Sequence, residues 1–81
     1  MPVGTIAAVN RERRRVAIKY AGGVYAVVAI QSDWNIKVGG AISGAFDMRG
    51  SADLTLFSGD PALVYVEAFG CSADEALALL R

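Results

Sequence analysis

Four arginines stand within five positions of this sequence, and they are its clearest candidate for binding a charged ligand. Arg11, Arg13, Arg14 and Arg15 lie in the segment NRERRR, between two apolar stretches. A planar guanidinium group matches two phosphate oxygens at once, so this cluster can neutralise part of a nucleic-acid backbone. The other interpretation is a charged, solvated hairpin tip, which we favour because the sequence nearby lacks a platform of aromatic residues for stacking bases.

The residues predicted for a nucleic-acid contact are basic or aromatic and lie between positions 11 and 25. They are Arg11, Arg13, Arg14, Arg15, Lys19 and Tyr25. Binding through this set should be weak, non-specific and steeply dependent on salt, because it rests on phosphate neutralisation.

Charge is unevenly distributed along the chain. Residues 1–40 hold six basic and two acidic side chains, a formal charge of +4, whereas residues 41–81 hold two basic and six acidic, a formal charge of −4. The isoelectric point is near 6.1, and nucleic-acid-binding domains are usually basic overall. A basic half can meet a phosphate backbone, or the acidic half of a second subunit.

Residues suited to catalysis are scarce. The 81 residues include no histidine, so there is no imidazole base and no histidine metal ligand. Cys71 has no histidine partner, and Ser43 lacks both a base and the spacing of a nucleophile elbow. Asp47, Asp53 and Asp60 fall in expected turns or on an outward strand face, where a solvated charge is the ordinary role. We therefore expect no catalytic residue, no metal site and no cofactor, and a protein that is not an enzyme.

The elements expected to position these residues are short β-strands. Residues 15–20 alternate apolar and polar side chains, the pattern of a half-buried strand, and glycines at 22 and 23 suit a tight hairpin turn. Ser72 and Glu75 form a capping box that predicts the start of a helix. The expected strands cover residues 3–9, 15–20, 24–30, 41–46, 52–57 and 63–69, and the helix covers 73–80. This is one domain, residues 1–81: an all-β, five- or six-stranded OB-like barrel with a short C-terminal helix.

Two expected strands are apolar on both faces, which predicts contact with another chain. Residues 24–30 and 63–69 have this pattern, and 54% of the chain is hydrophobic, much for so small a barrel. We expect a homo-oligomer, with a different protein as the other possible partner. The predicted interaction residues are Val24, Val28, Tyr65 and Trp34. Trp34 has a second interpretation, as a plug that closes one end of the barrel.

The first meander resembles the cold-shock version of the OB-fold over residues 4–46. The matching segments are GTIAAVN at 4–10, RVAI at 15–18, VYAVV at 24–28 and VGGAI at 38–42. The resemblance implies the barrel fold and binding of single-stranded nucleic acid. However, Ala8, Val9, Arg15 and Ala17 stand where that family has aromatic residues, and only Tyr25 remains. A second correspondence, of Gly4-Thr5-Ile6 with Gly40-Ala41-Ile42, leaves open whether the two halves arose by duplication or are alike by chance.

The remaining features concern the compartment and the class of protein. Cys71 is the only cysteine, so no disulfide forms within the chain, and a cytoplasmic location is expected. The longest apolar run, residues 24–30, is far shorter than the about 20 residues of a membrane-spanning helix, so no membrane contact is expected. The sequence favours a non-catalytic module for protein interaction or self-assembly. The alternative is a weak, non-specific nucleic-acid-binding domain.

Overall fold

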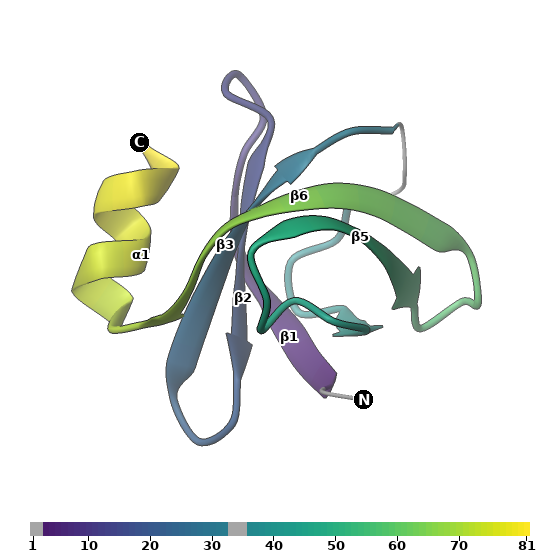
Figure 1. Cartoon of the computed structure of the whole chain (residues 1–81), viewed down its shortest axis with the longest axis horizontal. Helices are drawn as coiled ribbons and strands as arrows, with labels where there is room; N and C mark the ends of the chain where they lie inside the picture. The colour runs from purple at the N-terminus through teal and green to yellow at the C-terminus, as the bar shows by residue number, and fades with distance from the viewer. Residues whose placement is uncertain (1–2, 33–35) are drawn as a thin grey trace.

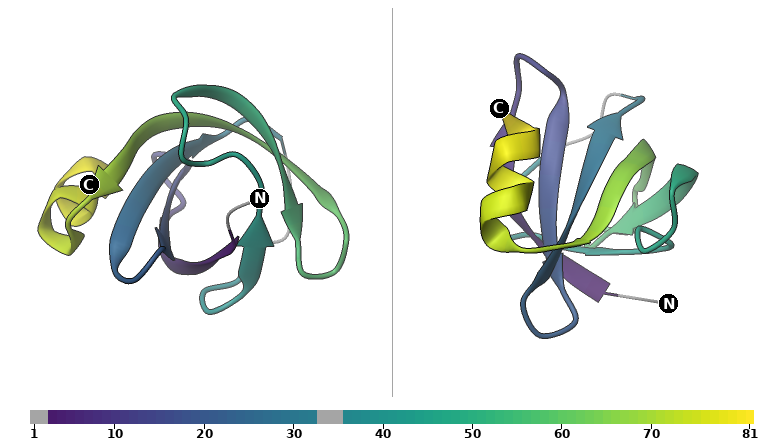
Figure 2. Two further views of the ribbon diagram at one scale, coloured as in Figure 1. Left: turned by 60° about the horizontal axis from the view of Figure 1, so that its bottom comes forward. Right: turned by 60° about the vertical axis from the view of Figure 1, so that its left-hand side comes forward.

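The chain folds into a closed antiparallel β-barrel with one helix on its outside (Figure 1). The computed structural model describes residues 3–32 and 36–81. Its elements are β1 (Val3–Asn10), β2 (Arg15–Tyr20), β3 (Val24–Ile30), β4 (Ala41–Ser43), β5 (Gly50–Leu56), β6 (Pro61–Cys71) and α1 (Ala73–Leu80). The strands close in the order β1-β2-β3-β6-β5-β4, and Figure 2 (left) shows the barrel as a ring. Of the two strand numbers predicted, six is the one observed.

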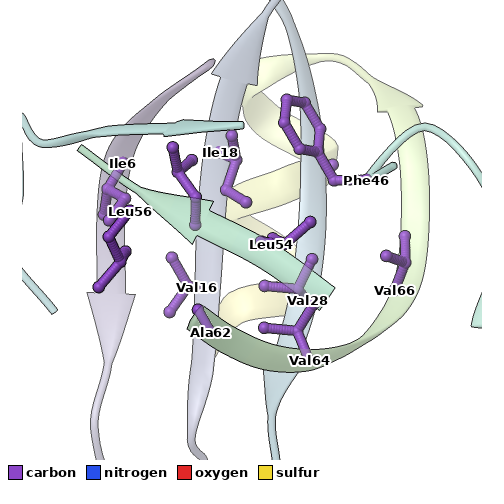
Figure 3. Close-up of a cluster of buried hydrophobic side chains, with 12 residues drawn as sticks. Ile6, Val16, Ile18, Val28, Phe46, Leu54, Leu56, Ala62, Val64 and Val66 are labelled. Atoms are coloured by element: carbon purple, nitrogen blue, oxygen red, sulfur yellow. The ribbon is translucent and has the colours of Figure 1, made fainter. Parts of the chain in front are cut away.

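Alternation within the strands fills the barrel with aliphatic side chains, as Figure 3 shows. The two most regularly alternating strands supply Val16 and Ile18 from β2 and Leu54 and Leu56 from β5, each at most 8% exposed. The alternation of residues 15–20 predicted a half-buried strand, and the burial of Val16 and Ile18 confirms it. Strand register is therefore fixed by burial, since a slip of one residue would turn each of these side chains to solvent.

The fourth strand is shorter than the predicted range 41–46. β4 ends at Ser43, because the chain turns at Gly44, whose φ of 141° is unfavourable for other residues. A Cβ on Gly44 would lie 2.6 Å from Leu54 Cδ2. The turn then carries Phe46 into the core, where its ring meets Tyr20 edge to face at 4.9 Å between centroids. β5 begins two residues earlier than predicted, and β6 is longer at both ends.

The two three-stranded meanders are related by an approximate two-fold axis. Residues 36 positions apart face each other at both seams of the barrel, Thr5 with Ala41 across β1–β4 and Ala29 with Tyr65 across β3–β6. The hairpins follow the same shift, since Arg15 pairs with Ala29 and Ser51 pairs with Tyr65. The β4–β5 pairing departs from it, in keeping with the short β4. The correspondence noted in the sequence is therefore a structural repeat.

Helix α1 covers part of the outside of the barrel (Figure 2, right). It begins with the predicted capping box, in which Ser72 Oγ accepts from Glu75 N and Glu75 Oε1 accepts from Ser72 N, both at 3.2 Å. Ala76 and Leu80 are buried, and Ala76 packs with Val27 and Cys71. Ala73 and Leu77 are exposed, so only a narrow side of α1 packs against the barrel.

Candidate interaction surface

The four-residue turn between β1 and β2 presents its arginine side chains to solvent. Residues 11–14 are exposed, and the turn is closed by Arg14 N donating to Arg11 O at 3.3 Å, with Arg14 at a φ of 54°. Asn10 stabilises the turn, because its Oδ1 accepts a hydrogen bond from Arg13 N at 3.2 Å. Arg11 Nη2 donates to Ile36 O at 3.4 Å. The predicted turn is present, and we call residues 11–14 the arginine turn.

The side chain of Arg15 binds other residues of the chain, whereas the sequence predicted that it would be open to contact phosphate. Its Nε lies 3.0 Å from Glu67 Oε1, and its Nη1 donates to Leu79 O at 3.0 Å. Asn10 Nδ2 donates in the same way to Leu80 O at 2.8 Å. Adjacent residues of β1 and β2 thus satisfy the carbonyls at the end of α1, groups that a helix cannot satisfy internally. Arg15 thus links β2 to β6 and to the end of α1.

Lys19 and Tyr25 lie at the opposite end of the β2–β3 hairpin from the arginine turn. They face each other in the ladder, and the four residue-to-residue steps from Arg15 to Lys19 span about 13 Å at ~3.3 Å each. Tyr25 is half-buried against the cluster of Val27, Cys71 and Ala76, so its ring is only partly open to stacking. The six residues predicted for nucleic acid therefore do not form one surface.

The predicted interaction residues also separate in space. Val28 has no exposed surface and points into the core, so it cannot contact a partner, and the prediction for this residue is wrong. Val24 is half-buried at the far end of the β2–β3 hairpin. Trp34 lies outside the described residues. Tyr65 is the member that faces outward, with 42% of its surface exposed.

The apolar outer side of β3 is covered by α1 and not by a second chain. Val27 is fully buried beneath the helix, which accounts for the run of apolar residues on both faces of that strand. β6 differs, because α1 packs against it only near Ala68 and Cys71. Its first half keeps Leu63 45% exposed beside Tyr65. The sequence predicted that the outer sides of both strands would contact another chain. The outer side of β3 is instead covered by α1, whereas the first half of β6 keeps an exposed outer side.

Leu63 and Tyr65 belong to a continuous outer surface formed by three strands. Tyr65 is flanked in register by Ala29 of β3 and Ser51 of β5, and Leu63 is flanked by Asp53. On the other side, Gln31 N donates to Leu63 O at 3.0 Å. We call Ala29, Gln31, Leu63 and Tyr65 the β3–β6 face. Leu63 and Asp53 were not predicted as site residues, although the alternation of β6, with Val64 and Val66 inward, places Leu63 on the same side as Tyr65.

Charges of opposite sign flank this face. The β2–β3 ladder continues past β2, since Ile30 N donates to Arg14 O at 2.8 Å, which places the arginine turn beside the end of β3. Across β3 and β6 from that turn stands Asp53, exposed on β5 and paired with Leu63. The surface therefore has the arginine turn at one edge, Leu63 and Tyr65 in the middle and the carboxylate of Asp53 at the other edge.

A recess and a thiol group also lie away from the β3–β6 face. A cavity of about 600 Å³ lies between residues 37–41 and the β5–β6 turn, and its Ser58 Oγ donates to Asp60 Oδ2 at 3.0 Å within that exposed turn. Burial, together with the nearby Glu75 carboxylate, raises the pKa of the Cys71 thiol, which makes it a poorer nucleophile at neutral pH. Among residues 3–32 and 36–81, no three carboxylate or cysteine side chains are grouped to hold a metal ion.

Comparison with known proteins assigns no family to this barrel. No protein-family model, no curated protein and no solved structure matches the chain. The resemblance to the cold-shock proteins stays a prediction. Within the described residues, α1 is the only helix, and it is too short to cross a membrane.

Proposed function

We propose that this protein is a non-catalytic interaction module that self-associates through the β3–β6 face. The observation that supports this most directly is the exposure of Leu63 and Tyr65 on β6, next to a region where α1 covers the same sheet. Apolar side chains gathered on one face of a small soluble domain are typical of a protein contact. Tyrosine is also enriched among the residues that contribute most to binding energy.

The polar chemistry of the molecule agrees with a binding role. Arg15 is bound to Glu67 and to the carbonyl of Leu79, and burial raises the pKa of the Cys71 thiol. A buried cysteine that forms no disulfide is typical of proteins in the reducing cytoplasm, which is the location we propose.

The experiment is sedimentation equilibrium of the full chain over a range of concentrations, with Leu63→Ser/Tyr65→Ser as the test variant. We expect the parent to exceed the chain mass of 8.5 kDa and the variant to return to it. Phe57→Ser is the matched control, because Phe57 is 89% exposed but lies in the β5–β6 connection, off the face. Equal association of the parent and the Leu63/Tyr65 variant would refute the proposed surface.

The second candidate is weak binding of nucleic acid at the arginine turn. It is favoured by the exposure of Arg11 and Arg13, and by Arg81, which lines the same shallow cavity as Arg11 between the turn and α1. A labelled single-stranded oligonucleotide, titrated at low salt into the parent and into Arg11→Ser/Arg13→Ser, tests it. Affinity that the double substitution leaves unchanged would remove the turn from consideration.

A further inference from the structure

From the charges that flank the β3–β6 face, we infer that its partner is a second copy of the chain, bound about a two-fold axis that runs along β6. This inference rests on the proposed function and specifies the partner and its orientation. The face is bounded by the arginine turn beside the end of β3 and by Asp53 on β5. These two edges lie on opposite sides of Leu63 and Tyr65, so the sign of the charge changes from positive to negative across the strands.

The positions of the two charged edges favour one arrangement of two copies of the chain. A two-fold axis parallel to β6 places the basic edge of each chain over the acidic edge of the other, with the apolar residues in contact at the centre. A two-fold axis that crosses the strands in the plane of the face would instead place the two arginine turns over each other, which like-charge repulsion disfavours. A surface that is self-complementary about a two-fold axis closes at two subunits, as isologous interfaces do.

The central residues suit this contact. Tyr65 lies in the middle of the ladder, between the small residues Ala29 and Ser51, and 42% of its surface is exposed. Leu63 adds a second apolar group two residues away, and both lie between the charged edges. Apolar residues at the centre with charged residues at the rim is the common anatomy of a protein interface.

The sequence carries the same asymmetry on a larger scale. Residues 1–40 bear a formal charge of +4 and residues 41–81 bear −4, although the whole chain is neutral. The fold converts this difference in sequence into two edges of one face, because β3 belongs to the basic half and β5 to the acidic half. Two copies about the inferred axis therefore meet basic half to acidic half on both sides.

Charge reversal tests the orientation. Arg13→Glu reverses the basic edge and Asp53→Lys reverses the acidic edge, and both residues are exposed, so neither variant should lose its fold. A version with Arg11→Glu added to Arg13→Glu enlarges the change at the basic edge. Each variant alone should self-associate about tenfold more weakly than the parent, because both symmetric contacts become repulsive.

The decisive sample is an equimolar mixture of the two variants. In a mixed dimer both contacts again join opposite charges, so affinity should return to the parental level at twice the chain mass of 8.5 kDa, with one of each variant per particle. Differently tagged chains and native mass spectrometry give that composition. Lys19→Glu and Asp47→Lys make the same changes of charge off the face and should behave like the parent, alone and mixed.

The outcomes separate the orientation from the proposed function. A parent that associates through Leu63 and Tyr65 but whose affinity is unchanged by Arg13→Glu, Arg11→Glu/Arg13→Glu and Asp53→Lys would overturn the two-fold arrangement and leave the interaction surface standing. Particles larger than two chains would also overturn it, since they indicate head-to-tail contact. A parent that stays at the mass of one chain would overturn both.

Discussion

Leu63 occupies in the second meander the position that Val27 occupies in the first, and only Val27 is covered. The two residues each lie two positions before the pair Ala29 and Tyr65, which face each other across the approximate two-fold axis. Val27 has no exposed surface beneath α1, whereas Leu63 is 45% exposed. The barrel thus has two equivalent outer sides, and α1 covers one of them. We propose that the uncovered side contacts a second chain.

The attachment of α1 should depend on Asn10, which binds both the arginine turn and the end of the helix. Asn10→Asp keeps an acceptor for Arg13 N but loses the donor to Leu80 O and places a negative charge at the negative end of the helix dipole. We expect a loss of about 1 kcal/mol in the free energy of unfolding. Hydrogen exchange of the α1 amides should accelerate more than that of the β2 amides, and equal protection in both proteins would contradict this role.

The core should be most sensitive at Ile18, which is fully buried among side chains of the other strands. Ile18→Ala should cost about 2–5 kcal/mol, a large share of the stability of so small a domain. Leu63→Ala removes a similar volume from an exposed site and is the matched control. A urea midpoint that shifts equally for both variants would show that the register of β2 is misassigned.

Gly4 is required by close packing and not by its backbone conformation. A Cβ at this position would lie 2.6 Å from Ile18 Cγ2 and 2.8 Å from Lys19 O, and the backbone oxygen cannot move without disturbing the β1–β2 ladder. Gly4→Ala should therefore destabilise the barrel by about 1–3 kcal/mol in thermal unfolding. Gly22→Ala meets no atom within 4 Å, and its cost should be limited to the strain of a positive φ, about 1 kcal/mol. The reverse order of the two costs would contradict this account of Gly4.

Stability should fall at alkaline pH through Cys71. Because the folded state raises the pKa of this thiol, the folded chain holds its proton more tightly than the unfolded chain does. The resulting stabilisation is complete below the pKa of the unfolded thiol and is lost as the pH rises through the folded pKa. Urea unfolding at neutral and alkaline pH should show this loss in the parent, and Cys71→Ala should reduce it. An equal alkaline loss in both proteins would assign the effect to other groups.

The sequence was sufficient to predict the strands and the helix, because their signals are local. Alternation at 15–20, the glycine turn at 22–23 and the Ser72 capping box each specify a short segment. The end of β4 could not be predicted in this way, because it depends on the approach of Gly44 to Leu54, which is distant in sequence. For the same reason, the apolar run of β3 indicated a partner chain, although the partner is the molecule's own helix.

The candidate site was only partly predictable. Tyr65 could be recognised from its strand, whereas the burial of Val28 and the internal bonds of Arg15 were not predicted. Arginine composition does not reveal that Glu67 and the carbonyl of Leu79 lie within reach of Arg15. Nor does the pattern of β3 distinguish the inner face, with Val28, from the outer face under α1. Asp53 gained its significance only from the register that sets it beside Leu63.

Self-association through the β3–β6 face should weaken as salt is added, since its charged edges are open to solvent. Raising the salt from about 50 mM to about 500 mM should screen these edges and leave the apolar contact of Leu63 and Tyr65. We expect a weaker dimer at high salt, with an unchanged salt response in Lys19→Glu. A dimer that strengthens with salt would indicate a purely apolar contact.

The most direct test of the central claim is the mass of the unmodified chain in solution, measured by sedimentation equilibrium from low micromolar concentration upward. We predict a reversible rise from 8.5 kDa to twice that mass, abolished by Leu63→Ser/Tyr65→Ser and retained by Phe57→Ser. A chain that remains at 8.5 kDa at every concentration would contradict the claim that the β3–β6 face is a self-association surface.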